Sequence, residues 1–499
     1  MVFLSNAISN ARIDASNAQD EVHHESVSTT IYGTRWASED IPRFEMPQLD
    51  GNPALNLATF VTTYMEDEAE KLMTENLSKN FIDYEEYPQS VELCNRCVNM
   101  IARLYHAPMH SADEEALGCS TVGSSEAIIL ATLAMKRRWQ NSRKEKGLPY
   151  DNPNLVLGAN CQVAWHKAIR YLEIEPREVE CTEEMLYMDP HKAVELVNEN
   201  TIGVCAILGS TYTGHYEDVK TLNTLLEAKN EANGWDIGIH VDAASGGFVA
   251  PFIVPDLEWD FRLSRVVSIN VSGHKYGLTY AGVGWAVWRS AEYLPKSLIF
   301  NINYLGSDQA SFTLNFSKGA AHVIAQYYVM IRLGQAGFRK IMSNLTATAD
   351  HLADKLRSTG RFTIMSESSG RGLPLVAFRL NGQLHYNEFD ISTKLRERGW
   401  IVPAYTMAPN VEHIKMLRVV VREDFSRSRC EILVKDILAA LHSLDEVDSL
   451  AIAKKREHHA KHSHSSLFSN NPNKPASKAS KETEFNTTED PKKPAQGIC

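Results

Sequence analysis

The sequence predicts an α/β protein with a mostly parallel sheet in a large domain, followed by a smaller C-terminal α+β domain. Two observations carry this prediction. From about residue 110 to residue 300, short apolar runs alternate with amphipathic stretches, a pattern typical of a parallel sheet covered on both faces. Beyond a long helical region, residues 361–453 mix short strands with helices. At 499 residues the chain is long enough for two or three domains.

The composition argues against several classes of protein. The formal net charge is -11, whereas nucleic-acid binders and proteins that dock on anionic membranes need a basic face. No apolar run approaches the ~20 residues of a membrane-spanning helix. The N-terminus also lacks the charged start and apolar stretch of a signal peptide. The eight cysteines are scattered along the chain, unlike those of a disulfide scaffold, so we expect a cytoplasmic protein.

The two ends of the chain differ from its middle. Residues 1–40 are rich in Ser, Asn, Asp and Glu, and residues 454–499 are basic, Ser-rich and low in apolar residues; we expect both to be disordered. Residues 41–110 predict an N-terminal helical segment, because 54–80 and 89–106 carry helix-like apolar spacing. A C-x-x-C pair, Cys94 and Cys97, has no second pair after it, which favours two thiols one helical turn apart over a metal or redox site.

The predicted large domain, residues 111–360, holds the strands that would position a site. Ligands of parallel sheets bind at the carboxyl ends of the strands, so the polar and Gly-rich residues just after each strand are the candidates. In the small domain, Ser426 is expected to cap the last helix. The strand candidates of the large domain are residues 154–159, 203–209, 237–244, 265–273 and 282–288.

Two of these strand ends carry residues suited to one kind of chemistry. Lys275 follows a β-branched strand in S-I-N-V-S-G-H-K-Y-G, and lysine amines form Schiff bases with aldehydes. Asp242 ends the strand of I-H-V-D-A-A-S-G-G-F, where a carboxylate could pair with a protonated ring nitrogen. Taken singly, an exposed loop lysine and a turn-capping Asp are the commoner interpretations. Together, the two residues match the protein's side of pyridoxal 5'-phosphate (PLP) chemistry.

A third stretch could hold the phosphate of such a cofactor. Gly123, Ser124 and Ser125 lie immediately before a predicted helix. Backbone amides and hydroxyls at a helix N-terminus form a ready anion site, although a short Gly-Ser turn is also an ordinary helix cap.

These stretches together resemble the group II PLP-dependent decarboxylases, and among them the glutamate decarboxylases. The similarity runs from about Arg43 to residue 445 and includes N-F-I-D-Y-E-E-Y-P-Q-S (80–90), H-V-D-A-A-S-G-G-F (240–248) and L-R-V-V-V-R-E-D (417–424). The resemblance implies the aspartate-aminotransferase-like fold (fold type I), with a mostly parallel seven-stranded sheet. It also implies PLP as cofactor and the decarboxylation of L-glutamate to 4-aminobutanoate and carbon dioxide.

Carried over to this sequence, the resemblance assigns roles around the cofactor. Lys275 would hold PLP covalently, and Asp242 would pair with its pyridine nitrogen. Thr211 would bond the phenolic oxygen, while Gln162 and Ala244 would lie against the two faces of the ring. The residues implied to hold the phosphate are Ser124, Ser125, His274 and, from the neighbouring subunit, Ser317.

The resemblance also assigns the substrate side. Arg418 matches the residue that clamps the α-carboxylate, with Arg422 as the alternative, and Tyr304 matches a loop tyrosine that returns a proton to the substrate carbon. An Asp near the substrate's distal carboxylate implies a shared proton. The residues that match the distal-carboxylate site, built at the dimer interface, are Thr59, Phe60 and Asp83.

The expected partners follow from the same resemblance. We expect a homodimer or higher homo-oligomer, with L-glutamate as substrate and no metal, nucleic acid or membrane. The segment MPQLDGNP is shorter than its family counterpart, and the resemblance implies that the missing piece helps to hold the dimer together. A related decarboxylase of another amino acid, an aminotransferase and a catalytically inactive scaffold remain the alternatives.

Deletion of residues 454–499 is expected to leave decarboxylation and oligomer formation nearly unchanged, because the segment lacks apolar anchors for a packed core. It also lacks the Trp and the spaced apolar residues of a calmodulin-target helix. Comparing the pH–activity profiles of the full-length and truncated proteins checks this. A shifted limb of the profile would show that the His-rich start of the tail regulates the enzyme.

Overall fold

The computed structural model describes residues 50–111, 113–303, 305 and 309–447. The chain divides into two units, residues 1–51 and 52–499, and all the described helices and strands belong to the second. The predictions for residues 1–40 and 454–499 fall outside the described residues.

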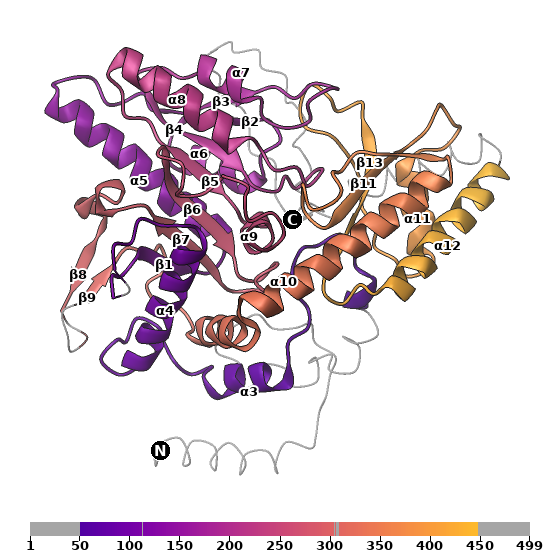
Figure 1. Cartoon of the computed structure of the whole chain (residues 1–499), viewed down its shortest axis with the longest axis horizontal. Helices are drawn as coiled ribbons and strands as arrows, with labels where there is room; N and C mark the ends of the chain where they lie inside the picture. Colours follow the sequence, from indigo (N-terminus) through magenta and orange to yellow (C-terminus); the bar gives the residue numbers. More distant parts are fainter. Residues whose placement is uncertain (1–49, 112, 304, 306–308, 448–499) are drawn as a thin grey trace, which may run out of the picture. The chain divides into compact units, whose positions relative to one another are not determined.

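A seven-stranded sheet forms the centre of the large domain (Figure 1). Its strand order is β1-β7-β6-β5-β4-β2-β3, and β7 alone runs antiparallel to its neighbours. This confirms the predicted mostly parallel sheet, and all five predicted strands are present. The strands are β1 (Leu117–Thr121), β2 (Asn154–Gly158), β3 (Glu175–Val179), β4 (Thr201–Ile207), β5 (Ile239–Asp242), β6 (Val266–Ser272) and β7 (Gly284–Trp288).

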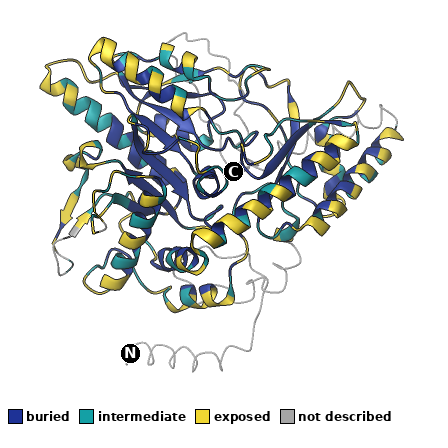
Figure 2. Ribbon diagram, viewed as in Figure 1, coloured by how far each residue is buried: buried dark blue, intermediate teal, exposed yellow. Residues whose placement is uncertain are grey.

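Helices cover both faces of this sheet, and Figure 2 shows its strands as the most deeply buried part of the domain. Every residue of β2, β4, β5, β6 and β7 is buried, which explains their near-continuous apolar runs. The helices of the domain are α5 (Ser124–Glu145), α6 (Val163–Tyr171), α7 (Pro190–Glu195), α8 (Val219–Asn233), α9 (Ala250–Ile253) and the long α10 (Ala321–Ser358), with short 3-10 turns η4 (Gly246–Phe248), η5 (Ala291–Tyr293) and η6 (Lys296–Leu298).

The N-terminal segment departs from its predicted helicity. Helix α4 (Pro88–Leu104) confirms the second predicted helix, and it buries Cys94 and Cys97 one turn apart. The stretch 54–80, however, forms only the 3-10 turn η3 (Pro53–Leu55) and α3 (Asp67–Glu75). Between them the backbone bonds to distant segments instead, Leu57 N to Ile401 O at 2.9 Å and Thr62 N to His274 O at 2.9 Å. Tertiary hydrogen bonds have therefore overridden the local apolar spacing.

The C-terminal part is built on an antiparallel sheet of order β10-β11-β13-β12. Ser426 accepts a hydrogen bond from Arg429 N at 3.2 Å and caps the last helix, as predicted. A β8–β9 hairpin (Phe300–Ile302 and Gln309–Ser311) precedes α10, which Gly334 interrupts at φ 56°. The remaining elements are β10 (Phe362–Ile364), β11 (Leu375–Leu380), α11 (Glu388–Arg396), β12 (Ala404–Thr406), β13 (Lys415–Val420) and α12 (Arg427–Asp445).

Side chains from the large sheet reach the smaller one. The hydroxyl of the buried Tyr276, four residues past β6, lies 3.3 Å from Pro374 O and 3.3 Å from Val421 O. A β-bridge also joins His215 to Gly372. The carboxyl ends of the central strands therefore lie against the start of β11 and the end of β13, which can both contribute to a site there.

Gly246→Ala is expected to destabilise the fold, because the added Cβ would lie 2.2 Å from the backbone oxygen of Leu208. Gly246 N donates to that same oxygen at 3.0 Å, so the turn after β5 cannot shift without losing the bond. We expect a loss of roughly 1–3 kcal/mol, the usual cost of overpacking, measured as a lower thermal midpoint. Gly319→Ala is the control, since its Cβ would meet nothing within 4 Å; equal midpoints would contradict the argument.

Candidate active site

Two adjacent parallel strands bring the predicted lysine and aspartate to one place. β5 ends at Asp242 and β6 ends three residues before Lys275, and their pairing in parallel puts both ends at one edge of the sheet. The Lys275 Nζ donates to Ser245 Oγ at 3.1 Å, three residues past Asp242. Sequence analysis did not single out Ser245, which orients the lysine.

The carboxylate of Asp242 is buried and held by three donors. Trp165 Nε1 donates to Oδ2 at 2.8 Å, while Asn270 Nδ2 and Ala244 N donate to Oδ1 at 2.9 and 3.1 Å. Only 5% of Asp242 is exposed. Hydrogen bonds to both oxygens fix the orientation of this carboxylate, and a carboxylate held in this way can pair with a cationic ring nitrogen.

Ser124 and Ser125, two of the residues predicted to hold a phosphate, lie at the N-terminus of α5. Ser124 is the first residue of the helix, and its Oγ lies 2.7 Å from Ser272 Oγ, whereas Ser125 is exposed. His274 Nδ1 donates to Val283 O at 2.9 Å, which leaves Nε2 as the second ring position. Burial, and next the charge of Lys275, lower the pKa of His274 to about 4. A phosphate dianion beside the ring would favour a proton on Nε2.

Glycine at position 123 gives this anion site its space. A Cβ at Gly123 would lie 3.1 Å from His274 Cε1, closer than the ring could accommodate without moving. The open corner between the helix N-terminus, the serine hydroxyls and the imidazole fits a phosphate group.

The residues predicted to surround a cofactor ring lie on loops at the same sheet edge. Thr211 follows β4, and its carbonyl oxygen accepts from the guanidinium of Arg418. Gln162 is the N-cap of α6, and its Oε1 accepts from Ala164 N at 2.6 Å. Ala244 follows Asp242 and donates to it. No recorded contact of the described residues assigns Gln162 to a ring face, so that role stays a prediction.

Arg418 is a fully buried cation that contacts the same aromatic ring as the lysine. Its guanidinium lies 4.9 Å from the centre of the Phe60 ring, and Lys275 Nζ lies 5.4 Å from the same centre. Burial lowers the pKa of Arg418, whose guanidinium donates to the carbonyl oxygens of Thr211 and Ala58. Within the described part of the chain it forms no ion pair, and its Nε has no hydrogen-bond partner. An unpaired buried charge is costly, and a substrate carboxylate would compensate it.

Arg422, the alternative to Arg418, already has a carboxylate partner. It pairs with Asp424 at 3.3 Å and donates to Val61 O at 3.0 Å and Pro53 O at 2.9 Å. These bonds tie the N-terminal stretch to the smaller sheet. The geometry therefore favours Arg418 as the substrate-binding arginine.

The remaining predicted residues separate into two groups. Thr59 precedes Phe60, and its Oγ1 accepts from Val61 N at 3.1 Å. Asp83 and the exposed Ser317 lie on neighbouring segments, since Asn80 Nδ2 donates to Ser317 Oγ at 3.4 Å and Phe81 N donates to Lys318 O at 2.7 Å. Tyr304 lies outside the described residues.

Sequence analysis missed the residues that support Asp242. Asn270, which donates to Asp242, lies between Ser268 and Ser272 at alternate positions of the apolar strand β6, and this alternation of polar residues could have indicated that they share a face. Trp165 gave no such signal, because a Trp on a helix is usually a core residue, and only the structure shows its bond to Asp242.

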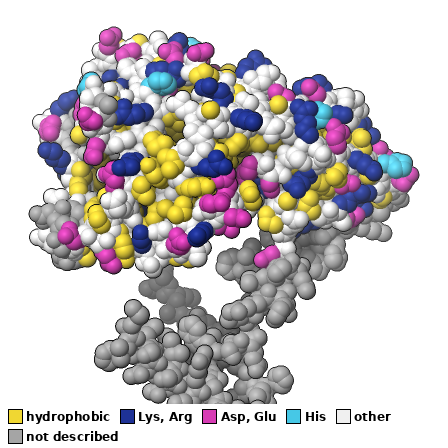
Figure 3. All heavy atoms as spheres, turned by 60° about the horizontal axis from the view of Figure 1, so that its bottom comes forward, with side chains coloured by type: hydrophobic (Ala, Val, Ile, Leu, Met, Phe, Trp, Pro, Cys, Tyr) yellow, Lys and Arg dark blue, Asp and Glu magenta, His cyan; other side chains and the backbone are white. Residues whose placement is uncertain are grey.

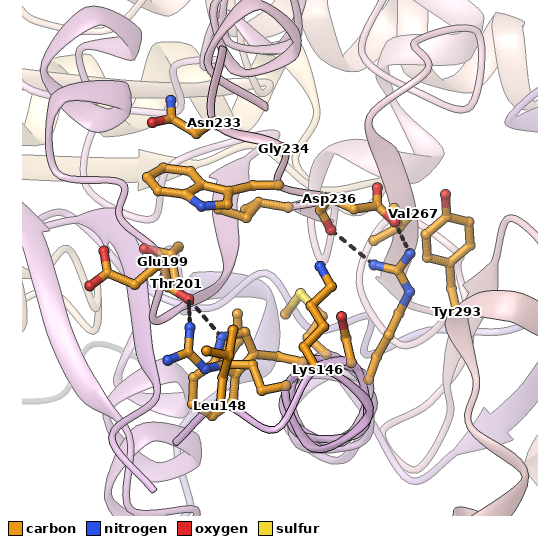
Figure 4. Close-up of a pocket in the computed structure, with 18 of the residues that line it drawn as sticks. Lys146, Leu148, Glu199, Thr201, Asn233, Gly234, Asp236, Val267 and Tyr293 are labelled. Carbon is orange, nitrogen blue, oxygen red and sulfur yellow. Dashed lines mark hydrogen bonds and ion pairs between the residues drawn. The ribbon is translucent and has the colours of Figure 1, made fainter. Parts of the chain in front are cut away.

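A cavity of about 440 Å³ lies at the opposite, amino-terminal end of the strands (Figure 4). Its lining includes Thr201 at the start of β4, Val267 near the start of β6 and Gly234 after α8. None of the predicted site residues lines it. The cavity therefore lies away from the predicted chemistry, which the side chains at the carboxyl ends of the strands locate.

Comparison with known proteins identifies the family. The family model described as the pyridoxal-dependent decarboxylase conserved domain matches residues 37–381. The chain belongs to the pyridoxal-dependent decarboxylases. The glutamate decarboxylase of Petunia hybrida is 57% identical over 442 residues, 85% of this chain and 88% of that one. The glutamate decarboxylase of Aliivibrio fischeri is 43% identical over 447 residues, 84% of this chain and 95% of that one.

Solved structures agree with the fold of this decarboxylase. The Lactobacillus brevis glutamate decarboxylase superposes with a TM-score of 0.78 at 41% identity, covering 86% of this chain and 97% of that one. Oryza sativa TDC with PLP and tryptamine reaches 0.69 at 17% identity, covering 89% and 98%, and so supports the fold alone. These matches confirm the predicted fold class and the PLP cofactor. The lysine, the aspartate and the α5 N-terminus provide groups of the right chemistry for it.

Proposed function

We propose that this decarboxylase converts L-glutamate to 4-aminobutanoate and carbon dioxide. The observation that carries the proposal is the buried guanidinium of Arg418, which shares the Phe60 ring with the ammonium of Lys275 and has no carboxylate partner among the described residues. An α-carboxylate held there would lie in the same group of side chains as the lysine, around the Phe60 ring. The names of the relatives, glutamate decarboxylases at 42–57% identity, support glutamate as the amino acid.

The side chains around this position have separable tasks. Bound PLP supplies an aldehyde for the substrate amine and a cationic ring that accepts the electron pair left by carbon dioxide. Lys275 holds the cofactor through Nζ, which Ser245 orients. Asp242 keeps the proton on the pyridine nitrogen. Arg418 binds the α-carboxylate with its planar guanidinium and fixes its direction, a task of geometry as much as of charge.

The other cofactor contacts belong to the proposal as well. Ser124, Ser125 and His274 would bind the phosphate, with Ser317 of a second subunit. Thr211 would bond the phenolic oxygen. Gln162 and Ala244 would contact the two faces of the ring. The helix N-terminus at Ser124 and the space beside Gly123 support the phosphate assignment.

The distal end of the substrate would meet residues near Phe60 and across a subunit interface. We assign its carboxylate to Thr59, Phe60 and Asp83, with one proton shared between the two acids. Tyr304 is proposed to return the proton to the substrate carbon. Asp83 and Ser317 lie on adjoining segments, so one interface could deliver both to a neighbouring site.

An oligomeric, cytoplasmic enzyme is part of the same proposal. Figure 3 views the face that carries α3 and the first part of α10, where hydrophobic side chains gather beside acidic ones. Tyr64 and Ile331 are 61% and 56% exposed, which suits a homodimer or higher homo-oligomer. Among the described residues no helix is long and apolar enough to cross a membrane. Calmodulin is not an expected partner.

A substrate panel tests the reaction itself. Purified protein with added PLP is offered glutamate, glutamine, aspartate and aromatic amino acids, and carbon dioxide and the amine are both measured. Release of carbon dioxide from glutamate alone supports the proposal. Amine transfer to a keto acid, or preference for an aromatic amino acid, would overturn it.

Lys275→Ala is expected to abolish turnover, because the amine of Lys275 makes and breaks the bond to the cofactor. PLP should still bind weakly through the phosphate and Asp242 contacts. Carbon dioxide release from glutamate is the measurement, and Lys435→Ala, at an exposed position of α12, is the control. Activity of even a few per cent of wild type in the Lys275 variant would contradict the assignment.

Arg418→Lys should lower kcat/KM for glutamate by about 100-fold, since a lysine keeps the charge but loses the two-pronged geometry that aligns the carboxylate. Arg422→Lys is the matched variant, and it should mainly lower the thermal midpoint, because Arg422 ties Val61 and Pro53 to β13. Steady-state kinetics and thermal unfolding of both variants decide the matter. A neutral Arg418→Lys beside a crippled Arg422→Lys would show that Arg422 binds the substrate.

A further inference from the structure

A chain of polar side chains leads from Asp242 into the centre of the sheet. Asn270 Nδ2 donates to Asp242 Oδ1 at 2.9 Å, and Asn270 Oδ1 lies 2.7 Å from His240 Nε2. His240 Nδ1 in turn lies 2.8 Å from Ser268 Oγ. All four residues are buried, with at most 5% exposed. Because water does not reach them, each polar atom depends on the next one in the chain.

The strand register builds this chain. β5 and β6 pair in parallel with His240 beside Ser268 and Asp242 beside Asn270. Alternate residues of a strand share one face of the sheet, so the four side chains form a two-by-two patch. Trp165 closes the patch, since its ring lies 5.4 Å from the His240 ring and its Nε1 donates to Asp242 Oδ2.

The direction of every hydrogen bond in the chain follows from Asp242. A carboxylate only accepts, so Asn270 must present its amide nitrogen to Asp242 and its oxygen to His240. His240 therefore carries its proton on Nε2, and Nδ1 accepts from the hydroxyl of Ser268. Burial lowers the pKa of His240, which agrees with a neutral ring. A neutral ring with this tautomer satisfies all four side chains.

We propose that His240 and Asn270 are positioning residues, which fix the Asp242 carboxylate for its contact with the pyridine nitrogen. The inference rests on the role of Asp242 in the proposed function. Without the Nε2 proton of His240, the amide oxygen of Asn270 loses its donor, and the side chain is held only through its bond to Asp242. Trp165 and Ala244 donate to the carboxylate itself, so His240 is the residue that holds the far end of the Asn270 amide in place.

The test measures PLP affinity and the absorption spectrum of bound PLP, rather than activity. His240→Phe removes the Nε2 proton. We expect the affinity for PLP to fall about tenfold, the size of effect that is typical when a residue that orients a binding group is lost. The absorption band of bound PLP should also change. His240→Gln returns an N–H near the Nε2 position and should restore most of the affinity. Asn270→Asp adds a second carboxylate beside Asp242 and should weaken binding at least as much.

A matched control separates positioning from general damage to the sheet. Asn154 is a buried asparagine of β2 at the other end of the strands, bonded to Thr201 Oγ1 at 2.7 Å and Asn198 Oδ1 at 2.9 Å. Asn154→Asp should lower stability and leave PLP affinity and spectrum unchanged. Ser268→Ala, which removes only a hydroxyl, is the mild variant should the larger changes prevent folding, and a small loss of affinity is expected.

The outcomes distinguish this inference from the proposed function. Asp242→Ala serves as the reference. If it retains wild-type PLP affinity, the role of Asp242 is wrong and the positioning role falls with it. If Asp242→Ala weakens binding while the His240 and Asn270 variants lose no more than Asn154→Asp, only the positioning role is overturned. An equal loss in His240→Phe and His240→Gln would also overturn it.

Discussion

Strands β5 and β6 pair in parallel, with Asp242 beside Asn270, and this pairing sets where the other groups of the site can lie. It brings the turn that carries Lys275 next to the turn that carries Ser245, and their side chains meet at 3.1 Å. It also stacks His240 beneath Asp242 on one face. A slip of one residue in this register would turn each side chain to the other face of the sheet. The site is therefore a consequence of strand register before it is one of loop structure.

The buried charges of the site are compensated in different ways. Asp242 receives three hydrogen bonds from the protein itself, so its negative charge is stabilised before any ligand arrives. Arg418 contacts carbonyl oxygens and the rings of Phe60 and Tyr405, but it has no carboxylate partner among the described residues, and the proposed function assigns that place to a substrate anion. The uncompensated buried charge of Arg418 is costly in the free protein. Binding of a matching anion removes this cost and is therefore more favourable.

The strands that sequence analysis missed are the two at the edges of the sheet. β1 (L-G-C-S-T) and β3 (E-P-R-E-V) contain few apolar residues, and β3 is exposed over its first two positions. An edge strand is covered on fewer sides, so burial selects its residues less strictly. The stretch after Leu55 failed for the opposite reason: its apolar spacing indicated a helix, but its backbone bonds to Ile401 and His274 hold it extended beside the lysine.

The fold class, the family and the available chemistry could be predicted from the amino-acid sequence, because a parallel sheet needs buried apolar strands and PLP needs a lysine and an acid at their ends. Lys275 and Asp242 could be chosen from it on chemical grounds. Only the tertiary structure distinguishes the surroundings of Arg418 from those of Arg422, since their hydrogen-bond partners include residues far away in the chain. It alone also revealed Trp165 and the His240–Asn270 pair, because hydrogen bonds between separate elements depend on distance in space, which sequence spacing does not record.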